Sequence, residues 1–398
     1  MALPYISRVI LRHSSKIKQL FPASRHSLSI DSLIRARVQS MQYQHSVTSK
    51  LSEPYSSVLG RSMHGSEQNG TRNRAHCWTY GIWSVMAFSF FGQTEEDTRD
   101  EAQKKEDEII LLLKKAKLSM KRGQLHVASG FLHQAIALAH KIHNTQAIIY
   151  TYSLMANLAY VQGQLDNAEK LFKAAMSFML SGGTPQDDNA VVEMSLKLAT
   201  IYAGQNKKEL AEHGFQFCTE SLEAKLEKKE TSTEEQSEEQ AEEAKKHRKE
   251  TRLLLGLCLD SRARYMAVTQ RPSQATRDYQ SALKICQEEQ GDTHPQSIVL
   301  LSDLATILDQ QGRYDEALPL VKKAVDLSRA AGHPDQHVLM GNMAGILLHQ
   351  GHLDESVHLY KEALTLAMSV GDEEAVEQIL AGLKEVDKKR NEPKEAQE

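Results

Sequence analysis

"LSDLATILDQQGRYDEALPLVKKAVDL" (residues 301–327) and "MGNMAGILLHQGHLDESVHLYKEALTL" (residues 340–366) are two copies of one pattern. In each, a small residue is followed by Gly seven positions later, by Ala or Ser twelve positions later and by Ala nineteen positions later. Self-similarity of this kind is typical of repeat architectures, in which each unit buries its apolar face only against its neighbours. The two segments therefore predict an array of helix pairs.

The same frame fits four more times earlier in the chain. The leading position of the six copies is always alanine: Ala116, Ala156, Ala199, Ala263, Ala305 and Ala344. The position twelve residues later is small as well: Ala128, Ala168, Ala211, Ala275, Ala317 and Ser356. So is the position nineteen residues later: Ala135, Ala175, Cys218, Ala282, Ala324 and Ala363. Small residues at these places let two antiparallel helices approach closely. The pattern resembles the tetratricopeptide repeat.

The position seven residues after each leading alanine predicts the turn between the two helices of a pair. Four copies have glycine there, namely Gly123, Gly163, Gly312 and Gly351, whereas the third and fourth copies have Asn206 and Gln270. The resemblance implies an all-α fold, a right-handed tetratricopeptide-repeat solenoid of six helix pairs plus a capping helix. A disordered basic leader and a short apolar helix are expected to precede it.

The intervals between copies predict how the array is divided. Repeats 1–3 are expected within residues 105–225 and repeats 4–6 within 249–371, followed by a capping helix and a polar tail at 372–398. The interval between the third and fourth leading alanines is 64 residues, far longer than the others, and it encloses a charged insert at 226–248. That insert is either two solvated helix extensions joined by a mobile acidic tip or a dedicated partner-binding element.

The first 74 residues have a different charge from the rest of the chain. They contain eleven Lys/Arg and three Asp/Glu, although the whole chain has a net charge of -4. Residues 1–30 contain no acid, and Arg8, Arg12 and Lys16 fall four apart, so a helix would carry a basic stripe. This pattern predicts a mitochondrial transit peptide with a disordered remainder, and a merely disordered tail is the alternative. The acidic remainder argues against nucleic-acid binding.

Residues 75–94 contain no Lys, Arg, Asp or Glu and are rich in aromatic and aliphatic side chains. Twenty helical residues span about 30 Å, the thickness of the hydrocarbon core of a bilayer. Arg72 and Arg74 precede the segment and acids follow it, which predicts a membrane or topogenic segment with its N-terminal side in the matrix. The repeat array would then face the intermembrane space. An interfacial or partner-docking helix, or the end of a cleaved leader, is the alternative.

No residue pattern in the chain indicates catalysis or cofactor binding. The four cysteines, Cys77, Cys218, Cys258 and Cys286, have no paired spacing, so neither a disulfide framework nor a structural zinc site is expected, and the last three are predicted to be buried. Phosphate-binding glycine loops, HExxH and GxSxG are absent from the sequence. We therefore expect no enzymatic activity, no cofactor, no metal and no small-molecule substrate.

A solenoid of this kind binds partners on the concave surface lined by the first helix of each pair. The repeat frame predicts six residues on that surface: Lys117, Asn157, Tyr160, Thr200, Arg264 and Thr306. Asn157 and Tyr160 are candidates for holding the backbone of an extended peptide, and Arg264 is a candidate for holding an acidic group.

Three segments carry a closer resemblance to a mitochondrial branch of the tetratricopeptide-repeat family. They are "TYSLMANLAYVQGQLDNAEKLFKAAMSFML" (151–180), "EMSLKLATIYAGQNKKELAEHGFQFC" (193–218) and "PSQATRDYQSALKICQEEQGDTHPQSIVLLSDLATILDQQGRYDEA" (272–317). The resemblance covers roughly residues 105–390. It implies a non-enzymatic inner-membrane adaptor that binds respiratory complex III and supports its assembly or maintenance. It also implies a role in clearing processed N-terminal fragments of the Rieske iron–sulfur subunit.

Two other functions stay open at this point. Residues 291–318, "GDTHPQSIVLLSDLATILDQQGRYDEAL", are similar to the repeats of kinesin light chains, which are cargo adaptors. The absence of an N-terminal heptad coiled coil and the presence of the basic leader count against that function. A regulatory subunit of a mitochondrial protease would have the same sequence features as a passive adaptor, so only a list of partners separates these two functions.

Overall fold

The computed structural model describes residues 101–230 and 238–391. The expected leader and apolar segment, residues 231–237 of the expected insert and residues 392–398 lie outside these ranges. The described chain forms thirteen helices and no strand: α4 (Glu101–Lys121), α5 (Leu125–Lys141), α6 (Thr145–Val161), α7 (Leu165–Ser181), α8 (Asn189–Gly204), α9 (Lys208–Glu230), α10 (Glu238–Val268), α11 (Pro272–Gln290), α12 (Pro295–Gln310), α13 (Tyr314–Ala331), α14 (Gln336–Gln350), α15 (Leu353–Val370) and α16 (Glu373–Asn391).

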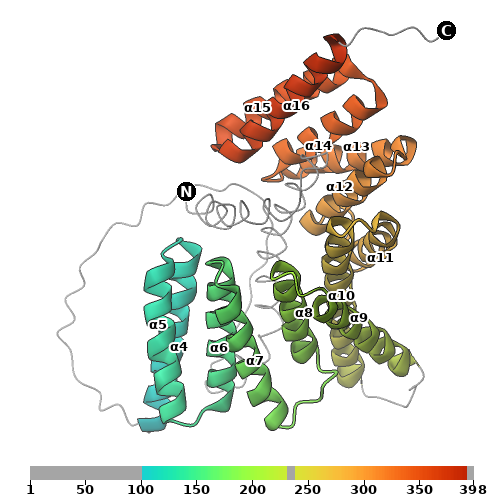
Figure 1. Ribbon diagram of the computed structural model, residues 1–398. Coiled ribbons are helices and arrows are strands. Elements are labelled where there is room, and N and C mark those ends of the chain that lie inside the picture. Colours follow the sequence, from blue (N-terminus) through green and yellow to red (C-terminus); the bar gives the residue numbers. More distant parts are fainter. Residues whose placement is uncertain (1–100, 231–237, 392–398) are drawn as a thin grey trace, which may run out of the picture.

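The helices stack in chain order into one curved array (Figure 1). Pairs α4–α5 to α14–α15 are the six repeats, and α16 packs against α15 and α14 at the C-terminal end. The expected all-α array of six helix pairs plus a capping helix is thus confirmed. Over the described ranges, no helix combines the length and the apolar character that crossing a bilayer requires.

The turns within the helix pairs follow the repeat frame. Gly123, Gly163, Gly312 and Gly351 all have positive φ, between 71° and 90°. Asn206 (φ 59°) and Gln270 (φ 61°) adopt the same left-handed conformation. Glycine reaches this conformation without steric cost, whereas side chains with a Cβ adopt it rarely, so the backbone geometry of the turn is kept even where its usual residue is replaced.

The eighteen frame positions form the helix–helix contacts. All of them, from Ala116 to Ala363, are completely buried. Larger side chains fill the space between neighbouring helices, among them Phe172, Phe215 and Tyr360, each at most 2% exposed. Small residues remove the bulk that would hold two helices apart, and the large residues then complete a densely packed interior.

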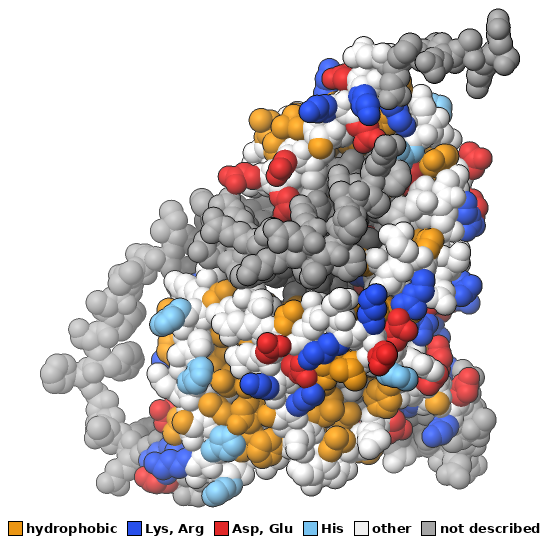
Figure 2. Space-filling model, in the orientation of Figure 1, with side chains coloured by type: hydrophobic (Ala, Val, Ile, Leu, Met, Phe, Trp, Pro, Cys, Tyr) orange, Lys and Arg blue, Asp and Glu red, His pale blue; other side chains and the backbone are white. Residues whose placement is uncertain are grey.

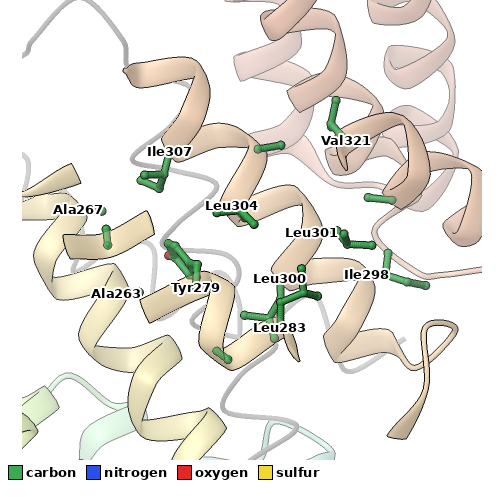
Figure 3. Close-up of a cluster of buried hydrophobic side chains, with 14 of the residues drawn as sticks. Ala263, Ala267, Tyr279, Leu283, Ile298, Leu300, Leu301, Leu304, Ile307 and Val321 are labelled. Carbon is green, nitrogen blue, oxygen red and sulfur yellow. The ribbon is translucent and has the colours of Figure 1, made fainter. Parts of the chain in front are cut away.

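Tyr279 shows how this packing links successive pairs. Its ring extends from α11 between Ala263 and Ala267 of α10 on one side and Leu304 of α12 on the other (Figure 3). The same apolar cluster continues from α8 through α16, and two smaller clusters cover the contacts from α4 to α8. Hydrophobic side chains also reach the surface over the N-terminal half of the array (Figure 2).

The helices on either side of the expected insert extend beyond the body of the array. α9 continues to Glu230 and α10 begins at Glu238, which makes them 23 and 31 residues long. Side chains from Gln240 to Lys246 are exposed, as the charged composition of this part of α10 requires. The guanidinium of Arg248 in α10 donates to the carbonyl of Leu226 in α9, so the two extensions are in contact.

The capping helix depends on one close approach. A Cβ placed on Gly382 of α16 would lie 2.5 Å from Cζ of the fully buried Tyr360 in α15. Such a distance is far inside van der Waals contact, and the ring has no free space to move into because its neighbours are packed around it. Glycine at this position therefore sets how closely α16 covers the last repeat.

We predict that Gly382→Ala destabilises the C-terminal end by about 1–3 kcal/mol, because overpacking forces the ring or the helix to shift. The control is Gly341→Ala in α14, where the new Cβ would meet Ile379 at an ordinary 3.8 Å. Urea unfolding gives the total change, and amide hydrogen exchange in α16 shows where it occurs. Equal effects of the two substitutions would contradict the proposed close-packing constraint.

Candidate partner-binding face

The six residues predicted to bind a partner all lie on the first helices of their pairs. Lys117 is in α4, Asn157 and Tyr160 are in α6, Thr200 is in α8, Arg264 is in α10 and Thr306 is in α12. Thr306 is buried and the other five are partly buried. Each of them is therefore already in contact with other parts of the array.

The N-terminal members of the set interact with the next repeat. Nζ of Lys117 lies 5.0 Å from the ring centroid of Tyr150, a cation–π contact between α4 and α6. The amide oxygen of Asn157 accepts a hydrogen bond of 3.1 Å from Nζ of Lys197 in α8. Nζ of Lys197 is also 3.6 Å from Glu193. These contacts place a cation, an amide and a carboxylate together across α6 and α8.

The two threonines are bound mainly within their own helices. Thr200 donates to the carbonyl of Leu196, and Thr306 donates to the carbonyl of Ser302, each at 2.9 Å. Their hydroxyl hydrogens are thus occupied, and only the oxygen lone pairs are available to a partner. Tyr160 packs beside the apolar cluster of α6 to α8. Tyr160 lies three residues after Asn157 on the same helix, α6.

Arg264 is held between two carboxylates. Its guanidinium donates to Asp260 one turn earlier through Nε and Nη2, at 2.8–2.9 Å, and Nη2 lies 3.3 Å from Asp303 of α12. Nε2 of Gln296 also donates to Oδ2 of Asp260, at 3.4 Å. Nη1 of Arg264, Oδ2 of Asp303 and the hydroxyl of Tyr279 are buried without a hydrogen-bond partner. The charge of Arg264 is therefore matched by two acids.

Burial changes the ionisation of this cluster. It raises the pKa of Asp303 to about 7, against the opposing effect of Arg264, and Asp260 adds to the rise. Burial also raises the pKa of Asp260, although Arg264 and Gln296 stabilise its charged form. With both carboxylates ionised the cluster has one excess negative charge, so it favours a cationic or hydrogen-bond-donating group over an anion.

Lys197, Asp260 and Asp303, which contact the predicted site residues, were not predicted themselves. The repeat period indicates one of these contacts. Asn157 and Lys197 are 40 residues apart, as are Ser302 and Asn342, whose amide donates to the serine hydroxyl at 3.0 Å. Residues one period apart on first helices lie side by side in the stack. Applying the 40-residue period to Asn157 would have pointed to Lys197 in the next repeat.

The described residues offer little for metal binding or thiol chemistry. Within 101–230 and 238–391 no three His, Cys, Asp or Glu side chains are placed to hold a metal ion. Cys218, Cys258 and Cys286 are buried as predicted, and burial raises the pKa of the Cys258 thiol well above its usual value. The arrangement instead presents paired charges and amides, which suit recognition of another chain.

Asp303→Asn provides a test of the buried cluster. Because the pKa of Asp303 is raised, its ionisation opposes folding above the unfolded-state pKa near 4, and the full cost is reached once the pH exceeds about 7. We expect the free energy of unfolding of the variant to equal that of the parent near pH 4. At pH 8 we expect it to be higher than that of the parent by roughly 1–4 kcal/mol. Urea unfolding measured across this range checks the expectation, and two parallel stability curves would contradict it.

Comparisons with known proteins agree with this architecture. The tetratricopeptide repeat model matches residues 257–330 and 338–367. The crystal structure of apo RapI aligns over 70% of this chain and 80% of its own at a TM-score of 0.51 and 10% identity, which supports the fold alone.

Tetratricopeptide repeat protein 19, mitochondrial, of Homo sapiens is 50% identical over 60% of either chain. Its Danio rerio counterpart is 68% identical over 79% of this chain and 76% of that protein. The chain therefore belongs to the family of tetratricopeptide repeat protein 19, mitochondrial.

Proposed function

We propose that this chain is a non-enzymatic mitochondrial adaptor that binds respiratory complex III and helps to clear processed N-terminal fragments of the Rieske iron–sulfur subunit. The family relationship supports the mitochondrial part, since the relatives carry that location in their names. The repeat array supports the adaptor part, because stacked helix pairs present a long surface to an extended chain.

The observation that carries the proposal is the series of polar contacts between successive first helices. Lys197 with Asn157, Arg264 with Asp303, and Asn342 with Ser302 place charged and amide groups along the array. A fragment bound in extended form offers backbone donors and acceptors to these groups. Where both Asp260 and Asp303 are ionised, the excess negative charge around Arg264 favours a basic side chain of such a peptide at that point.

The double variant Lys117→Ala with Asn157→Ala tests this surface. The tagged full chain is purified from the mitochondria of cells that express it, and the complex III subunits recovered with it are measured. We expect recovery of complex III subunits to fall at least about tenfold, which corresponds to 1.4 kcal/mol of binding free energy. The control combines Gln134→Ala with Lys170→Ala, two exposed positions on the second helices α5 and α7.

Cells lacking the chain should accumulate Rieske fragments, and re-expression of the parent chain should remove them.

Complex III recovery that is the same for both variants would exclude Lys117 and Asn157 from the binding surface. Absence of complex III from the parent purification would contradict the proposed function itself. Recovery of a mitochondrial protease in stoichiometric amounts, without complex III, would favour the regulatory-subunit function instead.

We further propose that residues 75–94 hold the chain at the inner membrane with the array in the intermembrane space. The uncharged segment and the arginines before it support this orientation. A C-terminal tag should resist protease in intact mitochondria and be digested once the outer membrane is ruptured. A tag that stays protected until the inner membrane is dissolved would place the array in the matrix.

A further inference from the structure

The N-terminal end of the array differs in charge from everything after it. Residues 109–165 contain six Lys/Arg and no Asp or Glu, whereas residues 166–398 contain 28 Lys/Arg and 41 Asp/Glu. From Ile109 onward the first helix pair is therefore cationic, whereas the start of α4 contains four acids and α6 has no Lys, Arg, Asp or Glu. This asymmetry is separate from the basic leader, which ends before α4 begins.

One face of α4 combines this charge with exposed apolar side chains. Leu111, Lys115, Leu118 and Arg122 follow one another at spacings of four, three and four residues, so they form one stripe of the helix. Leu111 is 50% exposed and Leu118 is 47% exposed. Lys115 and Arg122 are exposed as well, and we term these four residues the α4 stripe. Lys114 and Lys121 are exposed beside it.

The opposite side of α4 is fully used by the fold. Ile109, Leu112 and Ala116 are buried against α5 and α6. Because α4 is the first helix of the array, no earlier repeat among the described residues covers its outer side. At the other end of the array, α16 fills the corresponding place. Lys115 lies over the ring of Phe131 in α5, with Nζ 5.8 Å from the ring centroid. The exposed leucines of the α4 stripe are accounted for neither by the fold nor by the partner-binding residues.

We infer that the α4 stripe rests on the surface of an anionic phospholipid bilayer. Exposed leucines between lysines and arginines are the pattern of helices that lie in the membrane interface, where the apolar groups enter the headgroup region and the cations meet lipid phosphates. An acidic protein partner would match the charge but not the paired leucines. The apolar side chains thus favour lipid as the occupant.

The position of the stripe in the chain supports the same occupant. α4 begins at Glu101, and only six residues separate it from the apolar segment at 75–94. Six extended residues reach roughly 20 Å, so a bilayer that holds the segment lies within reach of α4. In this step the inference rests on the proposed membrane placement. The exposed leucines and cations of the stripe all belong to α4.

Cysteine accessibility in the full chain tests the inference. In a Cys77→Ser background the three remaining native cysteines are buried, so Leu118→Cys reports on the stripe. Met368→Cys in α15 is the matched position at the far end, since Met368 is 65% exposed. The chain is reconstituted into vesicles of phosphatidylcholine alone or of phosphatidylcholine mixed with phosphatidylglycerol, and a membrane-impermeant maleimide is added.

We expect the anionic vesicles to slow labelling at position 118 about tenfold relative to the neutral vesicles, with position 368 unchanged and the protection lost at high salt. Lys115→Glu with Arg122→Glu should abolish the protection. Lys322→Glu with Lys361→Glu, at exposed positions of α13 and α15, should leave it intact. Equal labelling of position 118 in both kinds of vesicle would overturn the inference.

Protection of position 118 in detergent without vesicles would also overturn it, because the stripe would then be covered by the chain itself or by a second copy. Vesicle flotation tests the proposed membrane placement separately from the labelling of the stripe. A chain that fails to float with neutral vesicles counts against insertion of residues 75–94. Labelling in anionic vesicles still decides whether the stripe binds lipid.

Discussion

Every helix of this array is positioned by the burial of a small side chain against its neighbour. Eighteen frame positions hold Ala, Ser or Cys, and none of them is exposed. A methyl or thiol group at the crossing point brings two helices close enough for aromatic residues such as Tyr279 and Tyr360 to fill the remaining space. A single helix pair cannot bury its apolar face, so each contact also supplies part of the core of the next repeat.

The same dependence on neighbours makes the two ends of the array special. At the C-terminal end, α16 covers the last repeat so closely that Gly382 cannot accept a Cβ without displacing Tyr360. At the N-terminal end, the described chain provides no such cover for α4, and the exposed side carries leucines and cations. The two ends of the described array thus differ, because α16 covers the last repeat whereas one face of α4 is exposed.

The sequence predicted the fold to the level of individual buried positions, because a six-fold repetition makes each position an average over several copies. It predicted the turns equally well, including Asn206 and Gln270 in place of glycine. The partner-binding residues were harder to predict, since the repeat frame indicates which side of a helix a residue occupies but not what lies across the gap. Arg264 was expected to be available to an acidic group, whereas Asp260 and Asp303 already surround it.

Contacts between residues one period apart explain why this face is polar and still ordered. Lys197 with Asn157, Asn342 with Ser302, and His349 with Asp309 each join side chains 40 residues apart. A change of charge at one position therefore alters the pairing in the adjacent repeat. Because the partners are already satisfied by each other, a peptide bound as we propose must offer groups that improve on an existing contact. Under that proposal, selectivity comes from the cost of displacing these pairs, which a chain with complementary charges at the repeat spacing offsets.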